Sequence, residues 1–209
     1  RRVTSRWKTR VTSQWKSTAE EVFALKGGTA INLFEWDLPR LSVDIDLTYL
    51  PVEDRTRSLR AIGEALARIK SEIERRLPPT RVTMTRQGQE GMEIKLNCQR
   101  DKTQIKVEVN PTLRGQLLPL RDLPSSDRVQ ERFEAFVEAR CISHGELFGG
   151  KICAVLDRQH PRDLFDVRRL LEGRASQRRF VTGSSRLWSV TAVRSRSFSA
   201  RGARTRTQH

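Results

Sequence analysis

Two carboxylates, Asp44 and Asp46, are the first candidates for a chemical role in this chain. They lie two residues apart within residues 40–47. Apolar and polar residues alternate here, and a period of two predicts a strand with residues i and i+2 on one face. The two side chains are therefore expected side by side. Paired carboxylates suit a hard divalent cation such as Mg²⁺, which takes oxygen ligands and brings substrate phosphates with it. The alternative is the exposed edge of a half-buried strand.

A glycine pair precedes this strand. Gly27 and Gly28 are followed by Thr29 and by a helix-like apolar pattern at residues 30–34, which together predict a turn that opens a helix. Glycines let a ligand approach the backbone, and the first N–H groups of a helix are free to bind phosphate. Most glycine pairs are only turns, so this pair gains weight from the paired carboxylates that follow it.

Further along the chain, other charged residues could serve the same chemistry. Glu108 lies on an alternating stretch at residues 104–109, either as a solvated residue or as a third carboxylate across the sheet from the first two. Lys151 lies in the middle of an expected helix, where an ordinary surface lysine is the alternative. Asp163 and Asp166 lie one turn apart near the start of another helix, where the helix macrodipole also favours acids.

The elements that must position these residues predict an α+β fold. The clearest helix covers residues 54–77, where apolar residues recur every three or four positions until Pro78. Short polar connectors between alternating stretches predict an antiparallel meander. The other expected elements are strands at 81–86, 92–96 and 104–109, a loop at 111–124, a helix at 126–138, a short strand near 139–142, and helices from 143 to about 156 and from 161 onward.

The charge of the chain lies at its two ends. The formal net charge is +15 over 209 residues, yet residues 1–17 and 174–209 contain no acid and residues 18–173 are formally neutral. The basic ends are weak support for a polyanionic partner. We expect a disordered basic extension at 1–17 and an Arg/Ser/Thr-rich tail at 174–209 that is disordered or not native. Between them we expect a core at 18–125 and a helical part at 126–173.

The cysteines and the hydropathy of the sequence indicate the cellular compartment of the protein. Three widely spaced cysteines form no disulfide framework and no metal-binding pattern, which favours a reducing compartment. No apolar run approaches the roughly 20 residues that a membrane span needs, and the N-terminus lacks the apolar core of a signal peptide. We therefore expect a cytoplasmic protein with no membrane partner.

Taken in order, these motifs resemble those of the AbiEii/AbiGii toxin family, within the DNA polymerase β-type nucleotidyltransferase superfamily. The resemblance covers about residues 20–172. Four motifs carry it: Gly27-Gly28-Thr29-Ala30 with Arg40, Ser42, Asp44 and Asp46; Lys106-Val107-Glu108-Val109; Ser143 and Lys151, with seven residues between them; and Asp163-Leu164-Phe165-Asp166 preceded by Arg158 and Arg162.

The resemblance implies a polymerase β-like core, with a mixed or antiparallel sheet flanked by helices and a short helical C-terminal part. It also implies roles for the motif residues. Asp44 and Asp46 would hold Mg²⁺, with a two-metal site possible, and Asp163 or Asp166 would orient or deprotonate the acceptor or fix Lys151. The nucleotide would be bound by Gly27, Gly28, Thr29, Arg40, Ser42 and Lys151, and the supporting residues would be Lys106, Glu108, Ser143, Arg158 and Arg162.

By the same resemblance, the chain would be an Mg²⁺-dependent toxin that transfers a nucleoside monophosphate from an NTP to an RNA acceptor, the tRNA 3′ end, restrained by a cognate antitoxin. Its ends lack the extra helices usual in the family, which favours a truncated or frame-disrupted copy. Two alternatives therefore stay open. One is an inactive remnant or partner-binding module of the same fold, and the other is nucleotidyl transfer to a small-molecule or protein hydroxyl.

Overall fold

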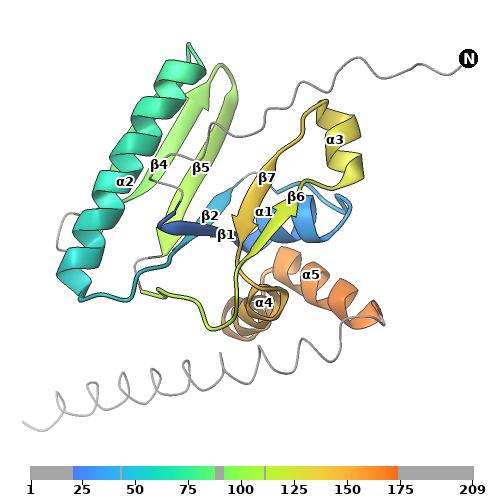
Figure 1. Ribbon diagram of the computed structural model, residues 1–209. Helices are drawn as coiled ribbons and strands as arrows, with labels where there is room; N and C mark the ends of the chain where they lie inside the picture. Colours follow the sequence, from blue (N-terminus) through green and yellow to red (C-terminus); the bar gives the residue numbers. More distant parts are fainter. Residues whose placement is uncertain (1–20, 43, 88–91, 111, 174–209) are drawn as a thin grey trace, which may run out of the picture. The chain divides into compact units, whose positions relative to one another are not determined.

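The computed structural model describes residues 21–173 except 43, 88–91 and 111 (Figure 1). The described residues fall into two compact units, divided after Ile142. The two basic ends expected from the sequence, at 1–17 and 174–209, lie outside the described residues. The structure places the division after residue 142, whereas the sequence suggested one after residue 125.

The first unit is built on a seven-stranded mixed sheet, which confirms the expected α+β class. The spatial order of the strands is β3-β4-β5-β2-β1-β7-β6. The β2–β5 and β1–β7 pairs are parallel, and the other neighbours are antiparallel. The strands are β1 (Phe23–Lys26), β2 (Ile45–Tyr49), β3 (Arg81–Gln87), β4 (Met92–Arg100), β5 (Thr103–Asn110), β6 (Arg121–Pro124) and β7 (Glu138–Cys141).

Helix α2 (Arg55–Arg76) packs against β4 and β3 and covers one face of this part of the sheet (Figure 1). Asp54, the residue before it, caps the helix: its carboxylate accepts a hydrogen bond from the backbone N–H of Arg57 at 2.9 Å, which satisfies one of the free donors of the first turn. The apolar stripe of α2 packs on strand residues that alternate toward it. This core contains Phe23, Tyr49, Ile62, Ala65, Leu66, Ile73, Val82, Leu96, Val107 and Val109.

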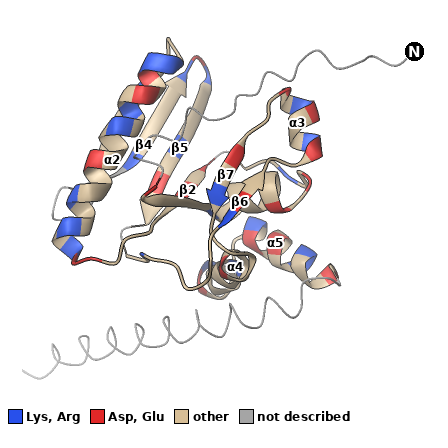
Figure 2. Cartoon of the chain, viewed as in Figure 1, with Lys and Arg blue, Asp and Glu red and all other residues tan. Residues whose placement is uncertain are grey.

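The outer side of α2 carries lysines, arginines and acids in alternation (Figure 2). Pairs three or four residues apart hold one another, as between Lys70 and Glu74 at 2.6 Å, and such pairs add only a few tenths of a kcal/mol each. Among the described residues, no helix is both long enough and apolar enough to cross a bilayer.

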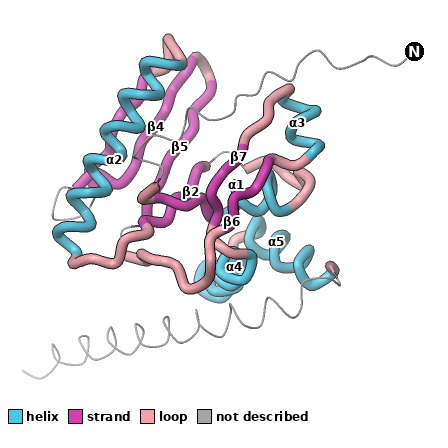
Figure 3. Tube along the Cα trace, in the orientation of Figure 1, coloured by secondary structure: helices cyan, strands magenta, loops and turns pink. Residues whose placement is uncertain are grey.

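The glycine pair opens a short helix, α1 (Gly27–Ala30), which continues as a π-helical segment, η1 (Ile31–Glu35). Segment 112–120 is a loop (Figure 3), but the expectation of a loop through residue 124 is wrong, because β6 pairs with β7 there. Helix α3 (Asp127–Phe133) is also shorter than expected. It ends where Glu134 adopts a positive φ of 49°, since a left-handed residue closes a helix.

The second unit has two described helices, α4 (His144–Arg158) and α5 (Pro161–Glu172). Ser143 caps α4, as its sequence pattern predicts, and its hydroxyl oxygen accepts from the backbone N–H of Glu146. Pro161 occupies the first turn of α5, where its missing N–H has no partner to lose. These two starts set the phase of both helices and so place Lys151 and the two acids of α5.

Candidate active site

The carboxylate of Asp46 lies directly against the backbone of Gly27. Gly27 has a positive φ of 70°, and a Cβ built there would lie 2.1 Å from Asp46 Oδ2. Any side chain at this position would collide with the carboxylate, and a left-handed backbone also disfavours other residues. Gly27 is therefore required both by its own conformation and by the close approach of Asp46.

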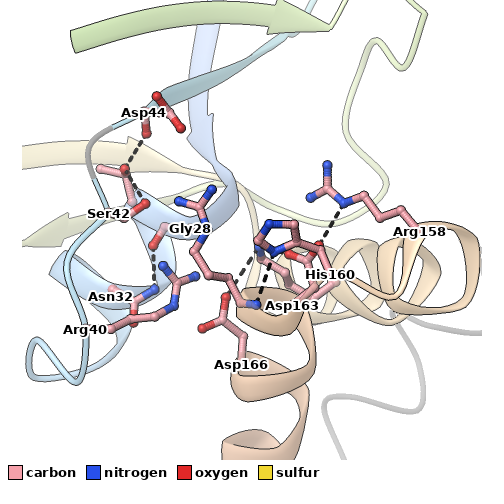
Figure 4. Close-up of polar contacts among 12 residues, drawn as sticks. Gly28, Asn32, Arg40, Ser42, Asp44, Arg158, His160, Asp163 and Asp166 are labelled. Atoms are coloured by element: carbon pink, nitrogen blue, oxygen red, sulfur yellow. Dashed lines mark hydrogen bonds and ion pairs between the residues drawn. The ribbon is translucent and has the colours of Figure 1, made fainter. Parts of the chain in front are cut away.

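The segment that leads into β2 folds over Gly28. A Cβ on Gly28 would lie 2.7 Å from Ser42 Oγ and 3.2 Å from a terminal nitrogen of Arg40. The Thr29 hydroxyl donates to the backbone carbonyl of Asp44 and lies 3.2 Å from Ser42 Oγ. Ser42 and Asp44 are labelled near Gly28 in Figure 4. The glycine turn and the segment before β2 thus hold each other, and Asp44 lies one residue before the strand rather than within it.

Four charged residues form a row across the sheet, on the face opposite α2. Lys26 pairs with Asp46, Asp46 with Glu108, and Glu108 with Lys95, on four adjacent strands. Lys95 Nζ lies 2.7 Å from Glu108 Oε1. Burial lowers the pKa of Lys26, and the charge of Asp46 opposes this shift. The two carboxylates are therefore neighbours, with one lysine beyond each.

A second charged cluster lies within the second unit. Lys151 Nζ contacts Asp163 Oδ1 at 2.7 Å and Asp166 Oδ2 at 3.4 Å, and the exposed Arg158 donates to the other oxygen of Asp163 at 2.8 Å. The Lys151 side chain is 11% exposed, and those of the two acids are at most 2% exposed. Burial by itself would raise the pKa of Asp163, but the hydrogen bonds from Arg158 and Lys151 outweigh it and hold that pKa below its usual range. Buried charges are retained when they are paired in this way.

The remaining motif residues have plainer surroundings. Ser143 Oγ accepts from the Glu146 N–H at 3.2 Å, as a helix cap does, and its hydroxyl donates to Glu146 Oε2 at 2.9 Å. The backbone N–H of Arg162 donates to His160 Nδ1. Lys106 is exposed and stands two residues before Glu108 on β5. The cap gives Ser143 a structural role, and its supporting role in the site stays a prediction.

Comparison with protein families identifies the chain. The family model described as nucleotidyl transferase AbiEii toxin, type IV TA system, matches residues 11–201. The chain belongs to the AbiEii nucleotidyltransferase toxin family. This confirms the resemblance drawn from the four motifs, and the matched span includes residues beyond α5.

Other comparisons add less. The search of curated proteins found no match. Among solved structures, the chain is similar to MenT4, a nucleotidyltransferase toxin from Mycobacterium tuberculosis H37Rv, with 17% identity and a TM-score of 0.49. The match covers 69% of this chain and 48% of the other, so this chain spans about half the length of MenT4.

Within this AbiEii-family chain, the predicted site residues fall into the two units. The first unit contains Gly27, Gly28, Thr29, Arg40, Ser42, Asp44, Asp46, Lys106 and Glu108, and the second contains Ser143, Lys151, Arg158, Arg162, Asp163 and Asp166. The pairing of Asp46 with Glu108 puts the third carboxylate where the sequence suggested it, across the sheet from Asp46.

The first group fits Mg²⁺ by its chemistry. Among the described residues, no three His, Cys, Asp or Glu side chains are arranged to hold a metal ion, so a cage made of protein ligands alone is not present there. Mg²⁺ is usually held by one or two carboxylates together with substrate phosphates. Asp46 suits this mode. Its carboxylate lies against the backbone of Gly27, which has no side chain that could cover it.

Three residues close to these groups were missed by the sequence reasoning. Lys26 and Lys95 end the charged row, and buried Asn32 donates from its side-chain amide to the carbonyl of Gly28 at 2.8 Å. Lys26 directly precedes the glycines and could have been noticed. Asn32 lies four residues after Gly28, a helical spacing that predicts this contact once the helix is assumed.

Proposed function

We propose that this chain is an Mg²⁺-dependent nucleotidyltransferase toxin that transfers a nucleoside monophosphate from an NTP to the 3′ end of tRNA. The observation that carries the proposal is the packing of the Asp46 carboxylate on the Gly27 backbone. This contact brings a carboxylate, which can bind a metal ion, next to a glycine turn, which can bind phosphate. Membership of the AbiEii family supports the same reaction class.

In this reaction the 3′-hydroxyl oxygen of the acceptor attacks the α-phosphorus of the NTP. The new P–O bond forms as the bond to the β-phosphate oxygen breaks, and pyrophosphate leaves with that electron pair while the hydroxyl proton passes to solvent. Bound Mg²⁺, held by Asp44 and Asp46, would supply charge neutralisation at the phosphates.

Residues of the first unit would bind and orient the triphosphate. The backbone N–H groups of the glycine turn and the Thr29 hydroxyl offer donors to phosphate oxygens. Arg40 and Ser42, which lie over Gly28, add a guanidinium and a hydroxyl next to the same turn. Because the turn and the strand hold each other, these donors are fixed before the substrate arrives, which avoids an ordering cost on binding.

The cluster in the second unit supports one of the roles considered for its acids. Both carboxylate oxygens of Asp163 already accept hydrogen bonds, from Lys151 and from Arg158, and its pKa is lowered by them against the effect of burial. A carboxylate of this kind is a poor general base. We therefore assign Asp163 to fixing Lys151, whose ammonium group would serve as a point charge for phosphate.

One experiment tests both the identity of the acceptor and which bond of the NTP breaks. The full chain is incubated with Mg²⁺, total RNA and each NTP in turn, labelled at either the α- or the γ-phosphate. We expect label from the α position only, in the tRNA band, and no label once the tRNA 3′ ribose has been oxidised with periodate. Label from the γ position would contradict nucleotidyl transfer. Label in protein or in small molecules would show that the acceptor is a protein or a small molecule rather than tRNA.

Absence of transfer would favour the second candidate, an inactive remnant or partner-binding module. The two are separated by nucleotide binding. A folded chain that binds no NTP in the presence of Mg²⁺ supports the inactive form. Transfer that is suppressed by the product of a neighbouring gene would support the proposed antitoxin partner.

A further inference from the structure

The face of the sheet opposite α2 brings two negative charges together. Asp46 on β2 and Glu108 on β5 are direct register partners in a parallel pair. Like charges directly opposite each other on adjacent strands destabilise a sheet. A positive charge beside these carboxylates therefore stabilises the folded chain when no cation is bound there.

Lys95 meets that need for Glu108. It is the register partner of Glu108 on β4, and the two side chains are joined at 2.7 Å with exposed fractions of 25% and 37%. On the other side, Lys26 stands beside Asp46. The charges across β1, β2, β5 and β4 thus run positive, negative, negative, positive, and each carboxylate has one lysine neighbour.

We propose that Lys95 is a positioning residue of the nucleotidyl-transfer site: its ammonium group holds Glu108 in the cation-free protein and competes with a divalent cation for that carboxylate. The inference rests on the proposed function. It follows from placement, because the same carboxylate faces Asp46 on one side and Lys95 on the other. A cation that binds beside Asp46 attracts Glu108 and must do so against the ion pair with Lys95.

The competing explanation is that the pair is an ordinary surface ion pair. Partly exposed pairs contribute up to about 1 kcal/mol, and removal of any nearby lysine also makes the local potential more negative. The two explanations differ in what they require of Glu108. Competition acts through that carboxylate alone, whereas a general change of potential does not depend on it.

The test is a set of Mn²⁺ titrations of the full chain at low ionic strength, with free Mn²⁺ measured by electron paramagnetic resonance. The variants are Lys95→Gln, Lys95→Arg, Glu108→Gln and the Lys95→Gln/Glu108→Gln pair. Lys102→Gln, in the turn between β4 and β5, is the matched control for loss of one positive charge. We expect Lys95→Gln to tighten Mn²⁺ binding about fivefold, the equivalent of the upper value for such a pair. Lys95→Arg and Lys102→Gln should leave it unchanged.

The decisive comparison is in the Glu108→Gln background. In that background Lys95→Gln should no longer alter the affinity for Mn²⁺, because the carboxylate that pairs with the lysine is absent. A fivefold effect that persists in that background, or equal affinities for Lys95→Gln and the wild type, overturns the proposal. If Lys95→Gln does not fold, Lys95→Met keeps the apolar stem and serves in its place.

A measurement without metal adds an independent readout. In urea unfolding with chelator, Lys95→Gln should have a lower midpoint than Lys102→Gln, and Glu108→Gln should restore it, since the repulsion with Asp46 is then gone. Equal midpoints for the two lysine variants count against the proposal. Competition for Mn²⁺ in a chain that transfers no nucleotide would support Lys95 while contradicting the proposed function. A wild-type chain that binds no Mn²⁺ would contradict both.

Discussion

Gly27 provides the sharpest test of how the site is built. Replacing it with Ala adds a methyl carbon 2.1 Å from Asp46 Oδ2 and 2.9 Å from the carboxyl carbon of that residue. The backbone there has a φ of 70°, and an L-residue in this left-handed region costs roughly 1–2 kcal/mol. The carboxylate must also move, and it is carried by a strand in the middle of the sheet.

We therefore expect Gly27→Ala to lower the free energy of unfolding by about 1–2 kcal/mol from the backbone alone and to remove most activity. A shift of the Asp46 carboxylate by the width of a methyl group would cost about a hundredfold in rate, the magnitude expected for a misplaced catalytic group. Urea denaturation measures the first effect, and transfer of α-labelled nucleotide to RNA measures the second.

Two other glycines are matched controls. A Cβ at Gly63, in the interior of α2, meets no atom within 4 Å, so Gly63→Ala should raise stability by about 0.5–1 kcal/mol and leave transfer unchanged. At Gly28 the Cβ meets the ends of the Ser42 and Arg40 side chains, which can move, so Gly28→Ala should cost less stability than Gly27→Ala. A Gly27→Ala protein with wild-type stability and transfer rate would refute the reasoning.

The remaining predictions concern the cluster around Lys151. Asp163→Asn removes one of the two charges that compensate this buried lysine, so the free energy of unfolding should fall by about 3 kcal/mol. Asp122→Asn, at an exposed ion pair, should cost at most about 1 kcal/mol. Because the folded pKa of Asp163 lies below its unfolded value of about 3.9, its contribution is complete above that pH and is lost as the pH falls through the folded pKa. The stability gap between wild type and Asp163→Asn, followed by urea denaturation, should thus narrow below pH about 4. A gap that stays constant in acid would contradict this assignment.

The local sequence pattern predicted the helices that bury an apolar stripe or that begin after a capping residue. Helix α2 was expected at residues 54–77 and covers Arg55–Arg76. Helix α4 begins directly after its cap residue Ser143, and α5 begins at Pro161, as these two residues indicate. Strand β6 was missed because its four residues carry little strand propensity of their own. It exists because β7 pairs with it, and such a contact has no local signal.

The charged row shows which part of the site a sequence can reveal. Strands β4 and β5 are joined by a two-residue turn, in which Asp101 has a φ of 51°. In a hairpin the turn sets the register, so recognising it would have placed Lys95 opposite Glu108. The expected strands instead ended at residue 96 and began at residue 104, because Asn97, Gln99 and Arg100 are polar residues more typical of a connector than of a strand.

The neighbouring pair in the row is a different case. Asp46 and Glu108 meet through a parallel pairing of β2 and β5, between which α2, β3 and β4 intervene in the chain. No spacing in the sequence fixes such a register, so only the order of the motifs suggested it. In the same way, the glycine pair predicted a turn, but the approach of the Asp46 carboxylate to Gly27 depends on the pairing of β1 with β2.

The most direct test of the central claim is the rate of α-labelled nucleotide transfer to tRNA by the full chain with Asp46→Asn. This change keeps the size of the side chain and removes its charge. We expect the rate to fall at least about a hundredfold, because several kcal/mol of phosphate charge stabilisation depend on that carboxylate, while Asp122→Asn transfers at the wild-type rate. Transfer by Asp46→Asn at the wild-type rate would contradict the account.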